Sequence, residues 1–252
     1  MKTKNLSVVI DLAEPPLPPA SVRVLGAGRF GRIAVERLSK RFPGARLLVV
    51  EGRKERLEAL RKNSSGRFET RIGDAVLSLE TEPVPEKGWI VPAVPVHVAF
   101  EWLLRILGGR VEVRSVPAPE AVDRLVPNPY RSPDGTLYAS FADFICPDSC
   151  SEPDEICTHT KGPRPGELFE VFGRAAPAGF RALVLRSLQL APGVGGYTGG
   201  QLRALLDAVL REEGRCLIAT SCRCHGVVNG LAWKNASRYG SLARGEKREN
   251  PD

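Results

Sequence analysis

Short apolar runs alternate with apolar stripes at helical spacing along most of the chain. The runs predict strands at Leu6–Ile10, Val22–Leu25, Leu47–Val50, Gly88–Pro92, Val111–Val116 and Arg181–Ser187, with a last strand at Cys216–Thr220. The stripes predict helices over Arg53–Lys62, Val96–Leu107, Glu167–Phe172 and Leu202–Leu210. Between them, Phe68–Leu79 favours a hairpin or strand pair, and Pro192–Gly200 favours a glycine-rich turn. Strands and helices in alternation are typical of the α/β class with a doubly wound, mostly parallel sheet.

A glycine motif follows the second of these strands. Gly26, Gly28 and Gly31 stand in the G-x-G-x-x-G spacing, directly after Val22–Leu25 and before a helical segment. The first glycine permits a tight turn, the second lets the backbone approach a pyrophosphate, and the third lets the helix pack closely on the strand. The next strand is followed by Glu51, where a carboxylate can bind both hydroxyls of a ribose. We therefore expect a diphosphate at the positive end of the helix that opens there.

The segment Gly26-Ala27-Gly28-Arg29-Phe30-Gly31, together with Glu51, resembles the NAD-binding Rossmann domains. It is most similar to the nucleotide-binding domain of bacterial potassium-transport regulators. The resemblance covers only about the first quarter of the chain, so it implies a fold and a ligand but no reaction. We expect a Rossmann dinucleotide-binding domain over residues 1–139. A cysteine-containing α/β half over residues 140–252 is expected to pack on it or to continue it.

The residues around Glu51 bear on the choice between NAD and NADP. A carboxylate at this position repels a 2'-phosphate and favours NAD. Arg53 and Lys54 follow at once and could bind that phosphate, so NADP stays an alternative.

Five of the six cysteines fall into two groups. Cys146, Cys150 and Cys157 have the spacing C-x3-C-x6-C and are followed by His159, whereas Cys222 and Cys224 share one side of an expected extended segment beside His225. The sixth, Cys216, opens an apolar strand and is expected in the core. Thiolates and imidazole together suit zinc or an iron–sulfur cluster. Neither group has paired C-x2-C spacing, so a metal site, free thiols and catalytic thiol chemistry all stay open.

Further polar residues are expected at the edge of the sheet where α/β proteins bind ligands. Arg186, Ser187 and Gln189 end one predicted strand, and Gly195 and Gly196 follow with backbone N–H groups for a substrate or another anion. His97, at a strand-to-helix turn, is a candidate proton carrier, as are His159 and His225. A flexible loop at the glycines and a packing histidine are the alternative interpretations.

Composition and charge narrow the class of partner. The 252 residues carry a net charge of +7, are 42% hydrophobic and only 6% aromatic, and spread their basic residues widely. We expect a small-molecule substrate and no nucleic acid, because no basic and aromatic platform is visible. No apolar run approaches a membrane span or the core of a signal peptide, so we expect a cytoplasmic chain without membrane insertion. A homodimer stays open.

These features support three hypotheses. The leading one is an NAD(P)-dependent oxidoreductase that transfers a hydride to or from a small substrate, with a Cys/His metal or thiol site near the nicotinamide. The second is a regulatory protein that senses NAD(H) without turnover and uses its cysteines as a structural zinc site or a redox-sensing patch. The third is an iron–sulfur protein that binds another adenosine ligand at the glycine turn.

Overall fold

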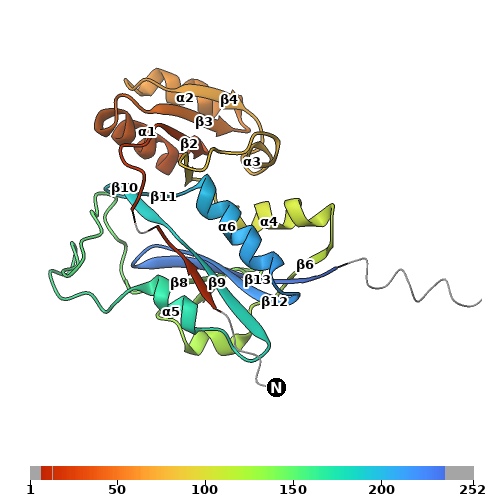
Figure 1. Cartoon of the computed structure of the whole chain (residues 1–252). Coiled ribbons are helices and arrows are strands. Elements are labelled where there is room, and N and C mark those ends of the chain that lie inside the picture. Colours follow the sequence, from red (N-terminus) through yellow and green to blue (C-terminus); the bar gives the residue numbers. More distant parts are fainter. Residues whose placement is uncertain (1–6, 13, 236–252) are drawn as a thin grey trace, which may run out of the picture.

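A computed structural model describes residues 7–12 and 14–235, which form two β-sheets with helices on their faces (Figure 1). This arrangement confirms the α/β class. Both sheets combine parallel and antiparallel pairs, so the expectation of a mostly parallel sheet holds only for a group of four strands in one sheet and a group of three in the other. Hairpins account for part of the antiparallel pairing in each sheet.

The first sheet has the strand order β10-β11-β5-β2-β3-β4. Its strands are β2 (Ser21–Leu25), β3 (Arg46–Glu51), β4 (Glu69–Ile72), β5 (Trp89–Pro92), β10 (Leu188–Ala191) and β11 (Val194–Thr198). The four strands β5, β2, β3 and β4 run parallel. Two crossover helices connect consecutive strands of this group. The helix α1 (Arg29–Arg41) joins β2 to β3, and α2 (Lys54–Asn63) joins β3 to β4. The hairpin of β10 and β11 then adds to the free edge of β5 in antiparallel pairing.

The second sheet has the order β1-β9-β12-β13-β8-β7, with β6 also paired to β13. Its strands are β1 (Val8–Ile10), β6 (Glu112–Val116), β7 (Tyr130–Arg131), β8 (Leu137–Ser140), β9 (Phe180–Arg186), β12 (Gly214–Ser221) and β13 (His225–Lys234). The remaining helices are α3 (Leu77–Thr81), α4 (Val98–Gly108), the 3-10 helix η1 (Glu120–Arg124), α5 (Leu168–Arg174) and α6 (Gly199–Leu210). Because β1 pairs with β9, each sheet takes strands from both sides of the boundary expected between residues 139 and 140.

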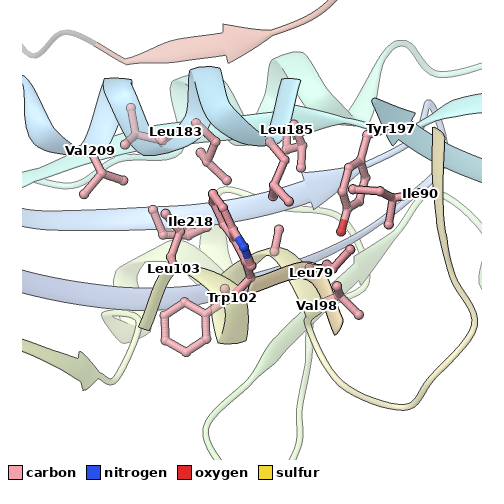
Figure 2. Packing of buried hydrophobic residues seen from close by; sticks show 14 of the residues in the cluster. Leu79, Ile90, Val98, Trp102, Leu103, Leu183, Leu185, Tyr197, Val209 and Ile218 are labelled. Carbon is pink, nitrogen blue, oxygen red and sulfur yellow. The ribbon is translucent and has the colours of Figure 1, made fainter. Parts of the chain in front are cut away.

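Three hydrophobic clusters hold these layers together. One packs α1 and α2 on the outer face of the first sheet, and another packs α5 and η1 on the outer face of the second. The third lies between the sheets, where α4 and α6 are buried. Figure 2 shows this shared core, in which Ile90 and Tyr197 of the first sheet lie in one group with Leu183 and Ile218 of the second and Trp102 of α4.

Several expected elements differ in the structure. The segment Phe68–Leu79 holds β4, which pairs in parallel with β3, followed by the start of α3, and is no hairpin. The glycine-rich segment Pro192–Gly200 contains the strand β11, and β12 is followed by the long strand β13. The first predicted strand begins at Val8, and Leu6 lies outside the described residues. Every helix in the described ranges is too short or too polar to cross a lipid bilayer.

Candidate functional site

Two of the three glycines in the turn between β2 and α1 are required by packing. Gly26 has a φ of +104°, and a Cβ there would lie 2.6 Å from the carbonyl oxygen of Ala93. A Cβ on Gly31 would lie 2.0 Å from the carbonyl oxygen of Gly26. A side chain at either position would therefore displace the turn or the helix behind it.

The third glycine, Gly28, faces open space. It is the N-cap of α1 with a φ of −73°, which any residue adopts. A Cβ there would meet no heavy atom of the described residues within 4 Å. Among those residues, no side chain caps α1, and its first turn holds no acid. The positive end of the helix is thus open to an anion.

Glu51 closes one side of this turn. Its Oε2 accepts a hydrogen bond from the Ala27 N–H at 2.9 Å, and its Oε1 accepts one from the Arg53 N–H at 3.0 Å. The Arg56 guanidinium lies 3.6 Å from Oε2. Burial raises the pKa of the carboxyl, but the two amides and Arg56 outweigh burial and hold the pKa below its usual value. The carboxylate is therefore ionised at neutral pH and directed at the glycine turn.

A hollow of about 280 Å³ opens beside the turn and is lined by three arginines, Arg29 and Arg32 of α1 and Arg56 of α2. Phe30 lies 56% exposed next to it, with the Arg29 guanidinium 5.6 Å from its ring centroid. Arg53 is the N-cap of α2 and does not line the hollow. Sequence reasoning missed Arg32 and Arg56, although spacing of three residues from Arg29 places Arg32 on the same helix face. The hollow suits a ligand with several negative charges.

The fold brings together four of the five cysteines predicted as a site. The loop between β8 and α5 carries Cys146, Cys150 and Cys157, and the turn between β12 and β13 carries Cys224. The Cys146 thiol interacts electrostatically with the other three, and burial is the main reason that its pKa rises to about 11. Within the described residues, however, no three His, Cys, Asp or Glu side chains converge as ligands of one metal ion.

Cys222 has different surroundings. The segment expected to be extended is a tight turn, in which the Cys222 N–H donates to the His225 carbonyl at 2.9 Å. The Cys222 sulfur accepts from the amides of Cys224 and His225 at 3.4 Å each. Burial and the nearby Glu152 carboxylate raise the pKa of the Cys222 thiol. Cys216 is fully buried in β12, in the core position expected for it.

Arg164 brings a half-buried cation to the four grouped thiols, and its side chain is a hydrogen-bond partner of Cys224. Its charge acts to lower the pKa values of Cys146, Cys157 and Cys224. Its Nε and Nη2 are buried and have no hydrogen-bond partner among the described residues. Buried donors without acceptors are costly, so this position holds positive charge that an anion would stabilise.

The cysteine loop, residues 141–165, docks on the glycine turn (Figure 1, green). Asp148, between the first two cysteines, forms an ion pair with Arg29 at the start of α1. Arg37 of α1 donates to the carbonyl of Asp148. The carbonyl of Cys150 accepts from the Gly193 N–H at 2.9 Å, which fixes the loop to the β10–β11 hairpin. The thiols and the anion site are therefore neighbouring parts of one surface.

His97 is buried between the sheets. Its Nδ1 lies 2.8 Å from Oδ1 of Asn229, and its Nε2 lies 2.9 Å from Oγ1 of Thr220. Burial lowers its pKa to about 4, against the opposing effect of the Asn229 hydrogen bond. The imidazole is neutral at pH 7 and, at 6% exposed, is placed as a core histidine.

The other two predicted histidines also stand away from the turn. His159 stacks on Phe144 with ring centroids 4.1 Å apart, and His225 lies beside Cys222. None of the three histidines lines the hollow at Gly28.

The residues predicted to bind a substrate or another anion do not all lie in one site. Arg186, Ser187 and Gln189 line a second hollow of about 430 Å³ with several side chains of the cysteine loop. Arg186 pairs with Asp11 there, and Gln189 donates to the Cys150 carbonyl at 2.8 Å. Gly195 and Gly196 lie in β11 and do not line this hollow. A Cβ on Gly196 would lie 2.4 Å from the carbonyl oxygen of Ile90, so this glycine serves close strand packing.

Comparison with known proteins places the chain in a family. Residues 99–234 match the AF_1314_C family, described as "Uncharacterized protein, C-terminal domain". An uncharacterized protein of Archaeoglobus fulgidus is 30% identical over 224 residues, which cover 82% of this chain and 97% of the relative. No solved structure matches the chain. The matched domain begins within the first turn of α4 and includes all five site cysteines. The chain therefore belongs to the AF_1314_C family.

Proposed function

We propose that the protein binds an NAD-type dinucleotide at the turn between β2 and α1, with the diphosphate against Gly28. The observation that carries this proposal is the open space at Gly28. Packing requires Gly26 and Gly31, but nothing in the described residues requires a glycine at position 28. A diphosphate approaching the backbone there explains the missing side chain, and the uncapped helix end supplies N–H donors for it.

The surrounding side chains fit the rest of such a ligand. A carboxylate has about four acceptor positions, of which two on Glu51 take the amides of Ala27 and Arg53. Arg56 approaches Oε2 at 3.6 Å, and the positions that remain are left for the hydroxyls of a ribose, as in a Rossmann-like site. Arg29, Arg32 and Arg56 complement the diphosphate. The negative charge of Glu51 favours NAD, whereas Arg53 and Arg56 leave NADP as the alternative.

Hydride transfer between the dinucleotide and a small substrate is the activity we propose. A bound nicotinamide ring would accept a hydride, two electrons with one proton, while the substrate releases its second proton to water or a base. His97 does not line the glycine turn and both its ring nitrogens are engaged, so in this proposal it supports the fold. The protein would position the dinucleotide through Gly28 and Glu51.

A second candidate is a sensor that binds NAD(H) without turnover. The ion pair between Arg29 and Asp148 favours it, because a diphosphate at Arg29 would compete with Asp148 and loosen the cysteine loop. Nucleotide occupancy would then be reported by the loop instead of by chemistry.

Calorimetric titration of the full chain with NAD⁺, NADH and NADPH tests the binding. We expect micromolar binding of NAD(H), and Gly28→Ala should weaken it more than about tenfold while leaving the melting temperature unchanged. Gly44→Ala is the matched control, because a Cβ there also meets no described atom within 4 Å but lies at the far end of α1. Absence of dinucleotide binding, or wild-type affinity in Gly28→Ala, would overturn the proposal.

Turnover is tested separately by following nicotinamide absorbance with panels of alcohols, hydroxy acids and aldehydes. A change in absorbance supports the oxidoreductase. Binding without any change across the panel, together with faster proteolysis of residues 141–165 in the presence of NAD(H), supports the sensor.

A further inference from the structure

Four cysteine thiols from two segments distant in sequence lie close enough to interact electrostatically. Cys146 interacts electrostatically with Cys150, Cys157 and Cys224, and Cys224 interacts with Cys150. The thiol of Cys222 instead faces the Glu152 carboxylate. The grouping therefore separates four thiols from the fifth, although Cys222 is only two residues from Cys224.

Backbone amides donate to two of these sulfurs. The Cys150 sulfur accepts from the Glu152 N–H at 3.4 Å. The Cys157 sulfur accepts from the amide and the side chain of Thr160 and from the amide of His159, and these bonds lower the pKa of the Cys157 thiol. Amide hydrogen bonds to sulfur are among the features that tune protein-bound iron–sulfur clusters. Cys222 receives similar bonds, so the grouping of the thiols, and not the amides, decides which cysteines belong to the site.

Arg164 gives a second, independent indication of an anionic ligand. Two of its buried nitrogens have no partner in the described part of the chain, and its charge acts on Cys146, Cys157 and Cys224. Four thiolates around a metal centre carry net negative charge, which the half-buried guanidinium of Arg164, already a hydrogen-bond partner of Cys224, would balance.

The four thiols interact electrostatically without converging on a single point in the described residues, which favours a cluster over a single ion. Four thiolates on one zinc ion stand about 3.8 Å apart, the edge of a tetrahedron with Zn–S bonds of ~2.3 Å. No three ligands converge in that way among the described residues, yet the four thiols are close enough to influence each other's ionisation. An iron–sulfur cluster meets this condition, because each cysteine binds a different iron atom at a corner of a larger core.

We propose that Cys146, Cys150, Cys157 and Cys224 bind a [4Fe–4S] cluster, with the half-buried Arg164 as its counter-ion. The proposal does not depend on the dinucleotide site, since the ligands come from the cysteine loop and the β12–β13 turn alone.

Anaerobic reconstitution of the full chain with ferrous iron and sulfide tests the proposal without any nucleotide. We expect about four iron and four sulfide per chain. The reconstituted chain should also show a broad visible absorbance that dithionite bleaches. Cys146→Ser and Cys224→Ser, one in each segment, should each lose most of the iron. Cys222→Ser is the matched control and should retain it. Circular dichroism and melting curves of the apo-proteins show whether each variant folds.

Three results would each overturn the assignment. They are a wild-type chain that takes up no iron under these conditions, a chain purified without oxygen that holds one zinc ion and no sulfide, and a folded Cys146→Ser variant that keeps its full iron content. A Cys222→Ser variant that loses iron as completely as Cys146→Ser would also overturn the choice of ligands. Loss of the cluster with retained NAD binding, or the reverse, separates this inference from the proposed function.

Discussion

At the scale of single residues, His97 joins the start of α4 to the second sheet through a buried polar chain. Oδ1 of Asn229 can only accept, so Nδ1 of His97 carries the hydrogen and Nε2 accepts from the Thr220 hydroxyl. Nδ2 of Asn229 in turn donates to Oγ1 of Thr136 at 3.0 Å. The neutral imidazole thus has both nitrogens satisfied at the start of α4, and protonation has no compensating partner in the core.

We expect this histidine to make folding depend on pH. The unfolded chain protonates the ring near pH 6.5, whereas the folded chain does so only near pH 4. The unfolded state therefore binds more protons between pH 6.5 and pH 4. The stabilising contribution of His97 is fully present above pH 6.5, and the free energy of unfolding falls as the pH drops from 6.5 to 4. In His97→Gln, which keeps a donor and an acceptor, the free energy of unfolding should fall by about 2 kcal/mol less between pH 7 and pH 5 than in the wild type. Urea unfolding at both pH values measures it.

The control for this prediction is His159→Gln, which changes an exposed histidine. It should keep the pH dependence of the wild type. Equal acid sensitivity of His97→Gln and the wild type would show that other groups carry the effect.

The sequence predicts those parts of the candidate site that depend on residues close together in the chain. The glycine spacing and the position of Glu51 predict a turn that the structure contains, because the chemistry lies within thirty consecutive residues. Arg164 could not be identified in this way. Its role becomes visible only when Cys224, which follows four further strands in the chain, is placed beside it.

At the scale of elements, local periodicity predicts the helices well, but it does not predict which strands pair with each other. The stripe at Leu202–Leu210 corresponds to α6, which begins three residues earlier because Thr198 and Gln201 form a reciprocal capping box. By contrast, β1 pairs with β9 across most of the chain, and the β10–β11 hairpin joins the first sheet instead of the second. No local pattern specifies a partner strand so distant in sequence.

The contact between the cysteine loop and α1 predicts that one substitution in the loop increases the affinity for NAD. Asp148 neutralises Arg29 beside the proposed diphosphate position. Asp148→Asn should therefore tighten NAD binding about two- to fivefold, in line with the ~0–1 kcal/mol of an exposed ion pair. The loop should lose one of its contacts with α1 and keep another, because Arg37 still donates to the backbone carbonyl of residue 148. Calorimetric titration gives the affinity and a melting curve gives the stability.

Asp143→Asn removes the same charge from an exposed position in the same loop and should leave the affinity unchanged. A weaker affinity in Asp148→Asn would mean that the ion pair organises the site instead of competing with the ligand.

At the scale of the whole molecule, the two sheets share one hydrophobic core. Leu25, Val50 and Ile90 of the first sheet belong to the same buried cluster as Leu183 and Ile218 of the second. The helices α4 and α6 complete this cluster between them (Figure 2). Separating the sheets would expose this surface to water, at a cost of about 25 cal/mol for each Å² of apolar area.

We therefore expect the chain to unfold as one cooperative unit. Trp89 lies in the first sheet and Trp233 in the second, so two variants that each retain one of them, both with Trp102→Phe, report on the sheets separately. Their fluorescence transitions in urea should coincide. Leu103→Ala, in the shared core at 0% exposure, should lower both midpoints together at a cost of about 2–5 kcal/mol. Two separate transitions, or a Leu103→Ala effect confined to one tryptophan, would mean that the sheets are independent domains. Nucleotide and cluster could then act on each other only through the loop contact at Asp148, and not through the core.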